Sequence, residues 1–331
     1  MDHRTSIQAA DRKRIGTARF SLASAVTLAV AKFVVGIVSG SLGVLSSAFD
    51  SLADIFMSGV NLLSIRKSME PADTSHPYGH GKVETLATLF QGLVIAATGI
   101  WVIREGILRL AAKRVPASAD AGIAVMVVGV IASWYISGRI RRAGEETGST
   151  ALVADSLHFR TDVWSNAGIL LSLALYRLTG WAWLDPGVAV AVGIYIAGIA
   201  GKLLFEAIQD LADRGLPPET VGRVEGIINS HRPLIVDFHD LRTRRSGSEK
   251  HVDFHVVVCR QFLLEDAHRV ADHIEKEVGN ALGNARVVTH IDPCSVVECP
   301  GKEHCERVLT DIRSLGDPAD EKTRDGRAGT P

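Results

Sequence analysis

Two pairs of ionisable residues lie inside long apolar segments of this sequence. Asp50 and Asp54 fall in the segment from about residue 44 to 65, and His158 and Asp162 fall in the segment from about 151 to 178. Each pair is spaced i, i+4, which places both side chains on one face of a helix. One imidazole and three carboxylates that converge in this way would form a four-ligand site for a divalent metal ion.

A membrane setting would give these residues a function. Ionisable side chains at membrane depth are costly and usually face a bundle interior or a water-filled cavity. A structural alternative stays open, in which the residues lie near helix ends and only cap or snorkel. Carboxylates packed together without a cation repel one another and tend to hold protons, so an incoming metal ion must displace protons. The pattern therefore predicts exchange of a metal ion for protons.

Six apolar segments can position these pairs, because a membrane-spanning helix needs roughly 20 apolar residues. Lys and Arg are concentrated before the first segment and after the second and fourth, which predicts that both chain termini are cytoplasmic. The six spans are expected at about 20–39, 44–65, 85–108, 121–140, 151–178 and 183–205.

The composition agrees with a protein that is half embedded in a lipid bilayer. The chain has 331 residues, with 36 Lys and Arg against 37 Asp and Glu, and this balance excludes a generic nucleic-acid-binding protein. Hydrophobic residues make up 47% and charged residues 22%, and the two kinds are segregated. Residues 18–208 are apolar, whereas residues 209–331 are as polar as a soluble domain. A purely soluble enzyme is therefore not expected.

The polar half predicts a small α+β domain with the order αββαβ. Helices are expected at 217–230 and 264–282, and strands at 235–243, 251–259 and 285–291. In the second strand, Val252, Phe254, Val256 and Val258 alternate with polar residues, as in a strand with one buried face. The predicted domains are an N-terminal segment (1–19), the transmembrane domain (20–208), the cytoplasmic domain (209–297) and a largely disordered tail (298–331).

Two further motifs contain metal-binding residue types. Asp73, His76 and His80 follow the second span as Asp-x2-His-x3-His, which fits either a metal site or a plain polar connection. Thiolate and imidazole ligands near the C-terminus suit zinc, but their spacing fits no standard zinc finger, and a redox role is the alternative. These extra candidate ligands are Cys294, Cys299, His304 and Cys305, whereas Cys259 is expected in the core.

These motifs resemble those of the cation diffusion facilitators, in particular the bacterial ferrous-iron/zinc efflux subgroup. The resemblance covers about residues 15–297 and is carried by the stretches 40–54, 71–84, 158–162, 239–244 and 290–297. It implies a homodimeric metal/proton antiporter of the cell (inner) membrane, with an all-α bundle of six transmembrane helices and a cytoplasmic, ferredoxin-like or metallochaperone-like, α+β domain. Zn²⁺ is the expected cargo and regulatory ion, with Cd²⁺, Fe²⁺ or Mn²⁺ as alternatives.

The resemblance also implies roles for individual residues. It makes Asp50, Asp54, His158 and Asp162 the transport site, and it makes the loop motif a weak or modulatory metal site. Lys82 and Asp213 resemble a pair that locks the two subunits together. His231, His251 and His273 match no family position and are expected at the surface. The implied cytoplasmic metal ligands are His239, His255, His268, His290 and Asp292, with Asp292 as a bridge between two ions.

Two other functions are compatible with parts of the sequence. A metal sensor or scaffold that does not transport would use the cytoplasmic domain alone, and the complete membrane quartet argues against it. A membrane zinc enzyme would keep one coordination position open for water, whereas four protein ligands fill a tetrahedral site. The sequence also has no His-Glu-x2-His motif. A transporter that is not an enzyme is therefore the prediction.

Overall fold

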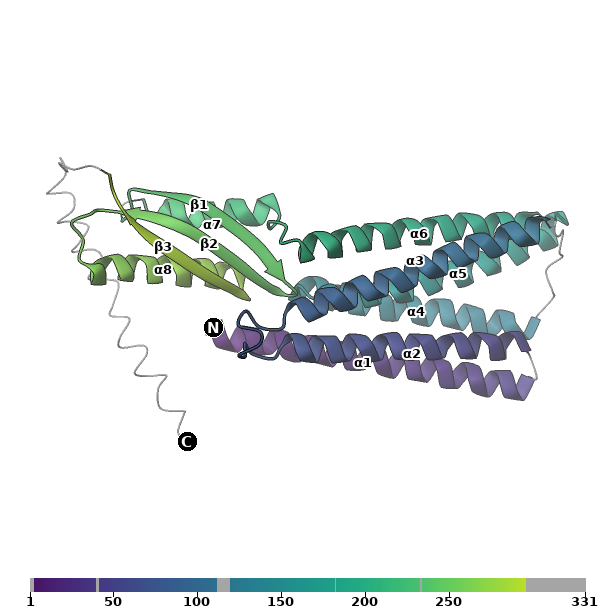
Figure 1. The fold of residues 1–331 in the computed structure, drawn as a ribbon. Helices are drawn as coiled ribbons and strands as arrows, with labels where there is room; N and C mark the ends of the chain where they lie inside the picture. Colours follow the sequence, from purple (N-terminus) through teal and green to yellow (C-terminus); the bar gives the residue numbers. More distant parts are fainter. Residues whose placement is uncertain (1–2, 40–41, 112–119, 182, 233, 296–331) are drawn as a thin grey trace, which may run out of the picture. The chain divides into compact units, whose positions relative to one another are not determined.

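The computed structural model describes residues 3–39, 42–111, 120–181, 183–232 and 234–295 (Figure 1). These residues form two compact units. The helical unit comprises residues 8–212 together with 246–248, and the sheet unit comprises the remaining described residues. Each unit is described by itself below.

The helical unit is built from six long helices. The shortest has 27 residues, or about 40 Å at 1.5 Å per residue, so each is long enough to cross a hydrocarbon core of roughly 30 Å. The first helix begins at His3, well before the predicted apolar segment, because polar and basic residues continue the same helix. The six are α1 (His3–Ser39), α2 (Leu42–Ser68), α3 (Lys82–Ala111), α4 (Asp120–Thr147), α5 (Thr150–Thr179) and α6 (Leu184–Leu211).

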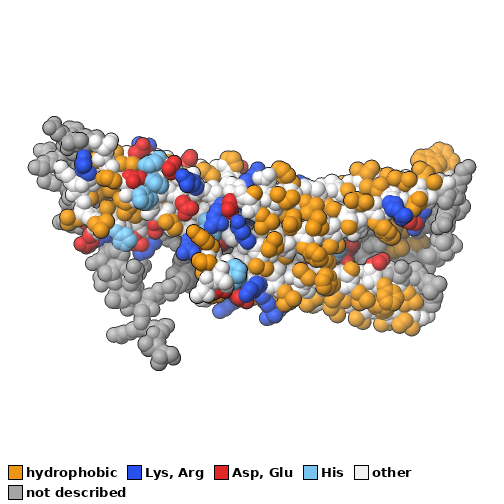
Figure 2. All heavy atoms as spheres, in the orientation of Figure 1, with side chains coloured by type: hydrophobic (Ala, Val, Ile, Leu, Met, Phe, Trp, Pro, Cys, Tyr) orange, Lys and Arg blue, Asp and Glu red, His pale blue; other side chains and the backbone are white. Residues whose placement is uncertain are grey.

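The surface of this unit suits a lipid environment. Among the described residues, α1, α2, α3 and α6 each contain a stretch that is long and apolar enough to span a membrane. Helices α4 and α5 have 28 and 30 residues, and their described parts contain no stretch that meets the same requirement. Large apolar side chains such as Val38, Trp101 and Ile131 are exposed, and Figure 2 shows hydrophobic side chains covering much of the visible helical surface. So much exposed apolar surface marks a membrane-facing protein.

Glycines allow α3 and α6 to pack closely. A Cβ atom at Gly99 would lie 2.9 Å from the backbone nitrogen of Ala197, and one at Gly193 would lie 3.0 Å from the carbonyl oxygen of Gly99. Small residues at such contacts are a common device in membrane helix packing. Helix α5 packs against α2, α3, α4 and α6, so it is held at the centre of the bundle.

The sheet unit has the predicted αββαβ order. Its sheet has the strand order β1-β2-β3, and β3 pairs with β2 in parallel. Strands β1 and β2 are connected only by Gly247 and Ser248, and so short a connection joins antiparallel strands. The elements are α7 (Pro218–Ser230), β1 (Asp237–Ser246), β2 (Glu249–Val258), α8 (Leu264–Leu282) and β3 (Ala285–Pro293).

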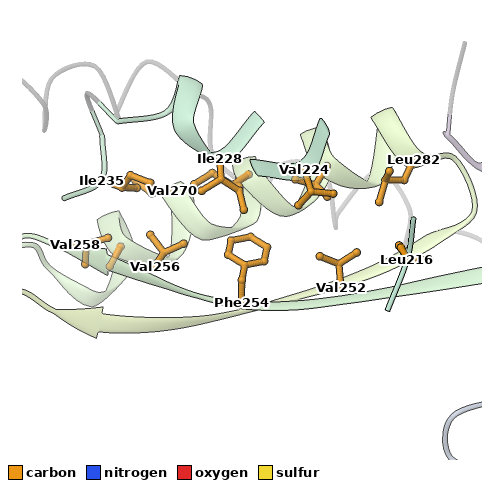
Figure 3. Packing of buried hydrophobic residues seen from close by; sticks show 13 residues of the cluster. Leu216, Val224, Ile228, Ile235, Val252, Phe254, Val256, Val258, Val270 and Leu282 are labelled. Atoms are coloured by element: carbon orange, nitrogen blue, oxygen red, sulfur yellow. The ribbon is translucent and has the colours of Figure 1, made fainter. Parts of the chain in front are cut away.

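Both helices of this unit cover the same face of the sheet. Val252, Phe254, Val256 and Val258 of β2 are buried, as their alternation predicts. Figure 3 shows these side chains pointing towards residues of α7 and α8, among them Ile228 and Val270. Since alternate residues of a strand face opposite ways, the intervening residues of β2 lie on the uncovered face.

A local irregularity of β1 affects which side chains reach the uncovered face. Phe238 and Leu241 both pack against the core although they are three residues apart, so the period of two is broken between them. Asp240 has a positive φ of 53°, which is unusual for a residue other than glycine. Asp240 is thus one residue more than a regular strand would have between Phe238 and Leu241, and Leu241 faces the core again. His239, next to Phe238, points away from the core.

The structure corrects one sequence-based expectation about histidines. His231 and His251 were expected at the surface, but both are buried. His231 closes the end of α7, where its Nδ1 hydrogen-bonds the Ile227 carbonyl oxygen at 2.8 Å. The His251 ring lies beside Glu249, with 3.5 Å between Nε2 and the carboxylate. Both rings are therefore shielded from solvent, whereas His273 is partly exposed.

Candidate metal centres

The first candidate centre lies between α2 and α5 of the helical unit. Asp54, His158 and Asp162 each offer a ligand atom, and these atoms all lie within 4.8 Å of one another. Nε2 of His158 is 3.0 Å from Oδ1 of Asp54. The side chains of His158 and Asp54 are 12% and 20% exposed, so the cluster is mostly withdrawn from the surface. One nitrogen and two carboxylates in such a setting can hold a divalent cation.

The fourth predicted ligand of this centre stays apart. Asp50 lies one helical turn before Asp54 on α2, and it is exposed. It does not belong to the group of atoms that lie within 4.8 Å of one another. The structure therefore brings three of the four predicted residues together.

Several polar residues around this centre were not predicted. Asp155 is fully buried one turn before His158, and it accepts a hydrogen bond of 2.5 Å from the Ser21 hydroxyl of α1. Lys32, also on α1, donates to the Ser51 hydroxyl of α2 at 2.7 Å. Their residue types could have pointed to them in the sequence. Asp155 lies three residues before His158 and shares its helix face, and a lysine such as Lys32 is unusual within an apolar segment.

A buried ion pair anchors the helices that carry the centre. Arg14 of α1 pairs with Glu84 at the start of α3, and their side chains are only 4% and 0% exposed. Glu84 also accepts hydrogen bonds from the Ser149 hydroxyl and from the Ala151 backbone N–H, the latter at 3.2 Å. Ser149 is the N-cap of α5, accepting from the backbone N–H of Leu152. The pair thus fixes the beginning of the helix that carries His158 and Asp162.

The second candidate centre is the loop after α2. Both oxygens of Asp73 face a histidine, with Oδ1 at 3.5 Å from His76 Nδ1 and Oδ2 at 3.4 Å from His80 Nε2. Hydrogen bonds from the Ser75 hydroxyl and from backbone N–H groups lower the pKa of Asp73 to about 2. His80 is buried and hydrogen-bonds the Glu70 carbonyl oxygen. All three predicted residues meet here, with the carboxylate ionised at neutral pH.

The third candidate centre lies on the uncovered face of the sheet. His255 is the register partner of His290 across the parallel β2–β3 pair. Asp292 is 2.8 Å from His255 Nδ1, 3.5 Å from His239 Nε2 and 3.5 Å from His290 Nε2. The pKa of Asp292 lies below its ordinary value, mainly because its carboxylate accepts a hydrogen bond from His255. Three predicted histidines therefore surround the carboxylate of Asp292, and four of the five predicted residues meet here.

Two residues depart from the prediction at this third centre. His268 is exposed on α8 and belongs to none of the described groups of converging ligands. Asp240 was not predicted, and its carboxylate converges with His239 and His255. The residue type of Asp240 alone does not indicate this position, because it depends on the positive φ of the backbone at Asp240.

The remaining predicted residues are placed as follows. Cys294 is buried, and its N–H donates to the Val258 carbonyl oxygen at 2.9 Å. Cys259 is buried just after β2, in agreement with the prediction. Lys82 donates to the Leu211 carbonyl oxygen at 3.3 Å, and Asp213 lies 3.4 Å from Arg244. The tail candidates Cys299, His304 and Cys305 lie outside the described residues.

Comparison with protein families gives two matches that cover most of the chain. Residues 18–212 match the "Cation efflux transmembrane domain", and residues 216–294 match the "Cation efflux protein, cytoplasmic domain". A solved structure of CzrB in its Zn form aligns with 26% of this chain and 99% of its own, at 33% identity and a TM-score of 0.25.

Curated relatives extend over nearly the same region. The chain is 38% identical to the cation-efflux pump FieF of Shigella flexneri serotype 5b over 264 residues, which are 80% of this chain and 87% of that protein. It is 37% identical to FieF of Escherichia coli O1:K1 over the same shares of the two chains. The prediction of a transporter that is not an enzyme is confirmed. The chain belongs to the cation diffusion facilitator family and is a membrane-embedded cation efflux transporter.

Proposed function

We propose that the chain exports Zn²⁺ from the cytoplasm in exchange for protons. The observation that carries this proposal is the convergence of Asp54, His158 and Asp162 between two helices of the helical unit. Imidazole and carboxylate are ligands that Zn²⁺ accepts, and Cd²⁺, Fe²⁺ and Mn²⁺ are the other ions that the same set can carry. Asp50 lies on the same helix face and supplies the fourth ligand when the ion is bound.

The contact between His158 and Asp54 supports proton coupling. At 3.0 Å, a proton between Nε2 and the carboxylate satisfies both groups. A metal ion that binds the same two atoms takes the place of this proton, because ligands must be deprotonated to bind. The released proton and the bound ion are then two halves of one exchange. With both termini in the cytoplasm, metal loads from the inner side and protons load from the outer side.

The other two centres serve as cytoplasmic metal sites in this proposal. Asp73, His76 and His80 already surround one point, which suits a modulatory site. The sheet cluster around Asp292 binds ions that stabilise a homodimer, to which His268 contributes a ligand. Lys82 and Asp213 lock the two subunits, and Cys294 with the tail residues forms an additional site. The proposed boundaries remain 1–19, 20–208, 209–297 and 298–331.

Transport in proteoliposomes tests the proposal. Purified protein is reconstituted, a pH gradient is imposed, and Zn²⁺ movement is followed with a fluorescent indicator. We expect uptake that is driven by the gradient and lost in Asp54→Ala, while His76→Ala serves as a control that keeps the membrane centre intact. Uptake that ignores the gradient would indicate a facilitated channel. No uptake in the folded wild-type protein would indicate a sensor or scaffold.

Calorimetry tests the proton exchange directly. Zn²⁺ binding is measured in buffers of different ionisation enthalpy, which reports the protons released per ion. His76, His239 and His290 are first replaced by alanine, since cytoplasmic sites also release protons. The ion takes the place of the proton held between His158 and Asp54, so about one proton per ion is expected. A value near zero in this background would contradict coupled exchange at the membrane centre.

A further inference from the structure

The sheet unit holds another cluster of metal-binding side chains that the sequence did not indicate. His231 at the end of α7, together with His273 and Glu277 of α8, brings three ligand atoms within 4.8 Å of one another. These helices cover one face of the sheet, whereas the cluster around Asp292 lies on the opposite face. The two clusters therefore share no residue, and the sheet lies between them.

His231 is held in one orientation, with a proton on its Nδ1 atom. Its Nδ1 atom lies 2.8 Å from the Ile227 carbonyl oxygen, which can only accept, so Nδ1 carries a proton. When the ring is neutral, the lone pair is therefore on Nε2. That atom lies 3.1 Å from a carboxylate oxygen of Glu277. A backbone carbonyl that fixes the far nitrogen of a histidine is a common feature of metal sites.

The arrangement needs a positive charge at its centre. Nε2 of neutral His231 and the carboxylate of Glu277 are both acceptors, and at 3.1 Å they repel unless something positive lies between them. Nε2 of His273 approaches the same carboxylate oxygen at 3.9 Å. His273 and Glu277 are spaced i, i+4, so their side chains stand side by side on α8. Either a proton on His231 or a metal ion held by all three residues resolves the repulsion.

We propose that His231, His273 and Glu277 bind a divalent transition-metal ion of the Zn²⁺ class. Ligands of a tetrahedral Zn²⁺ ion lie about 3.3 Å apart, as follows from metal–nitrogen bonds of about 2.0 Å. The distances of 3.1 Å and 3.9 Å to Glu277 fall on either side of this value. Two imidazoles and one carboxylate leave one position for water.

Burial makes this cluster both defined and accessible. The side chain of His231 is only 8% exposed, so its place is set by packing. The side chains of His273 and Glu277 are 39% and 48% exposed, so an ion can enter from solvent. A bound ion would join the end of α7 to α8 by coordinate bonds. The site is therefore a structural or regulatory one, and it goes beyond the transport of the ion through the membrane.

Counting bound ions in the full chain tests this proposal. The background protein carries Asp54→Ala, His76→Ala and His255→Ala, which remove one ligand from every other described cluster. Zn²⁺ is counted by equilibrium dialysis in detergent, and Co²⁺ is used as an optical probe of tetrahedral coordination. We expect His273→Ala in this background to lower the count by one ion per chain and to remove the corresponding Co²⁺ absorption.

Two matched variants on α8 sharpen the result. Lys276→Ala changes a neighbouring residue that is no ligand, and we expect it to leave the count unchanged. Glu277→Gln keeps the size of the side chain but removes its charge, so we expect Co²⁺ affinity to fall at least about tenfold. Circular dichroism and gel filtration verify that each variant is folded. An unchanged count in His273→Ala, or an equal loss in Lys276→Ala, would overturn the proposal and leave a protonated His231 as the source of positive charge.

Discussion

Replacing Glu84 with glutamine should destabilise the helical unit strongly. The substitution keeps the shape of the side chain but removes the charge that faces Arg14, whose side chain is 4% exposed. Removal of one partner of a buried ion pair costs about 3–5 kcal/mol, since the other charge is left buried. Asp11 lies 3.2 Å from Arg14 and offsets part of this loss, so we expect the lower end of the range.

Thermal unfolding in detergent measures this effect. For a unit of this size, 1 kcal/mol corresponds to about 2–4 °C, so a loss of about 3 kcal/mol lowers the melting temperature by about 6–12 °C. Glu105→Gln is the matched control on the same helix, because Glu105 pairs with Arg109 at the surface, at 3.0 Å. Such exposed pairs contribute about 0–1 kcal/mol. Equal shifts in the two variants would refute the anchoring role of Glu84.

Three further substitutions test the proposed sites. Asp54→Asn removes an anionic ligand without changing size, so it should abolish proton-driven Zn²⁺ uptake, and uptake at the wild-type rate would exclude Asp54 from the transport site. Asp50→His should favour Zn²⁺ over Cd²⁺ because a nitrogen replaces an oxygen; an unchanged uptake ratio would show that this position does not set selectivity. The pKa of Asp73 is about 2, below its ordinary 3.8, so Asp73 stays ionised above that range and is protonated only as the pH falls through 2. Protonation of Asp73 should therefore not weaken loop metal binding between pH 7 and 5. Ser75→Ala should raise the Asp73 pKa in an NMR titration, because it removes the hydrogen bond from the Ser75 hydroxyl, and an unshifted titration would contradict this.

The spacing of apolar residues in the sequence was sufficient to predict much of the fold. Helix α8 has the predicted bounds, Leu264–Leu282, because its apolar residues recur at the helical period over many turns. The alternation in β2 identified the buried face correctly. The beginning of α1 was missed, since hydropathy reports where a helix is apolar and not where it starts. His3 and the residues after it are polar yet helical.

The candidate sites were predictable to the extent that they depend on local spacing. The i, i+4 spacing brings His158 and Asp162 together beside Asp54, whereas Asp50, spaced in the same way from Asp54, stays apart. The loop motif lies within eight consecutive residues. Glu84 and Arg14 were not found, because their partners come from distant helices. The same reason explains His231, which meets His273 and Glu277 only when α7 packs beside α8. Asp240 depended on a backbone irregularity that residue type alone does not reveal.

The parallel pairing of β2 and β3 determines when the cluster around Asp292 can form. Parallel strands cannot be joined by a tight turn, so α8 has to cross the sheet before His255 and His290 become neighbours. His290 and Asp292 therefore join the hairpin residues His239 and His255 only after most of the domain is in place, so an ion that needs all four residues binds late in folding. Contacts that form after the transition state slow unfolding with little effect on the folding rate. A metal ion held there would act on the domain as a kinetic lock, lengthening the lifetime of the folded state.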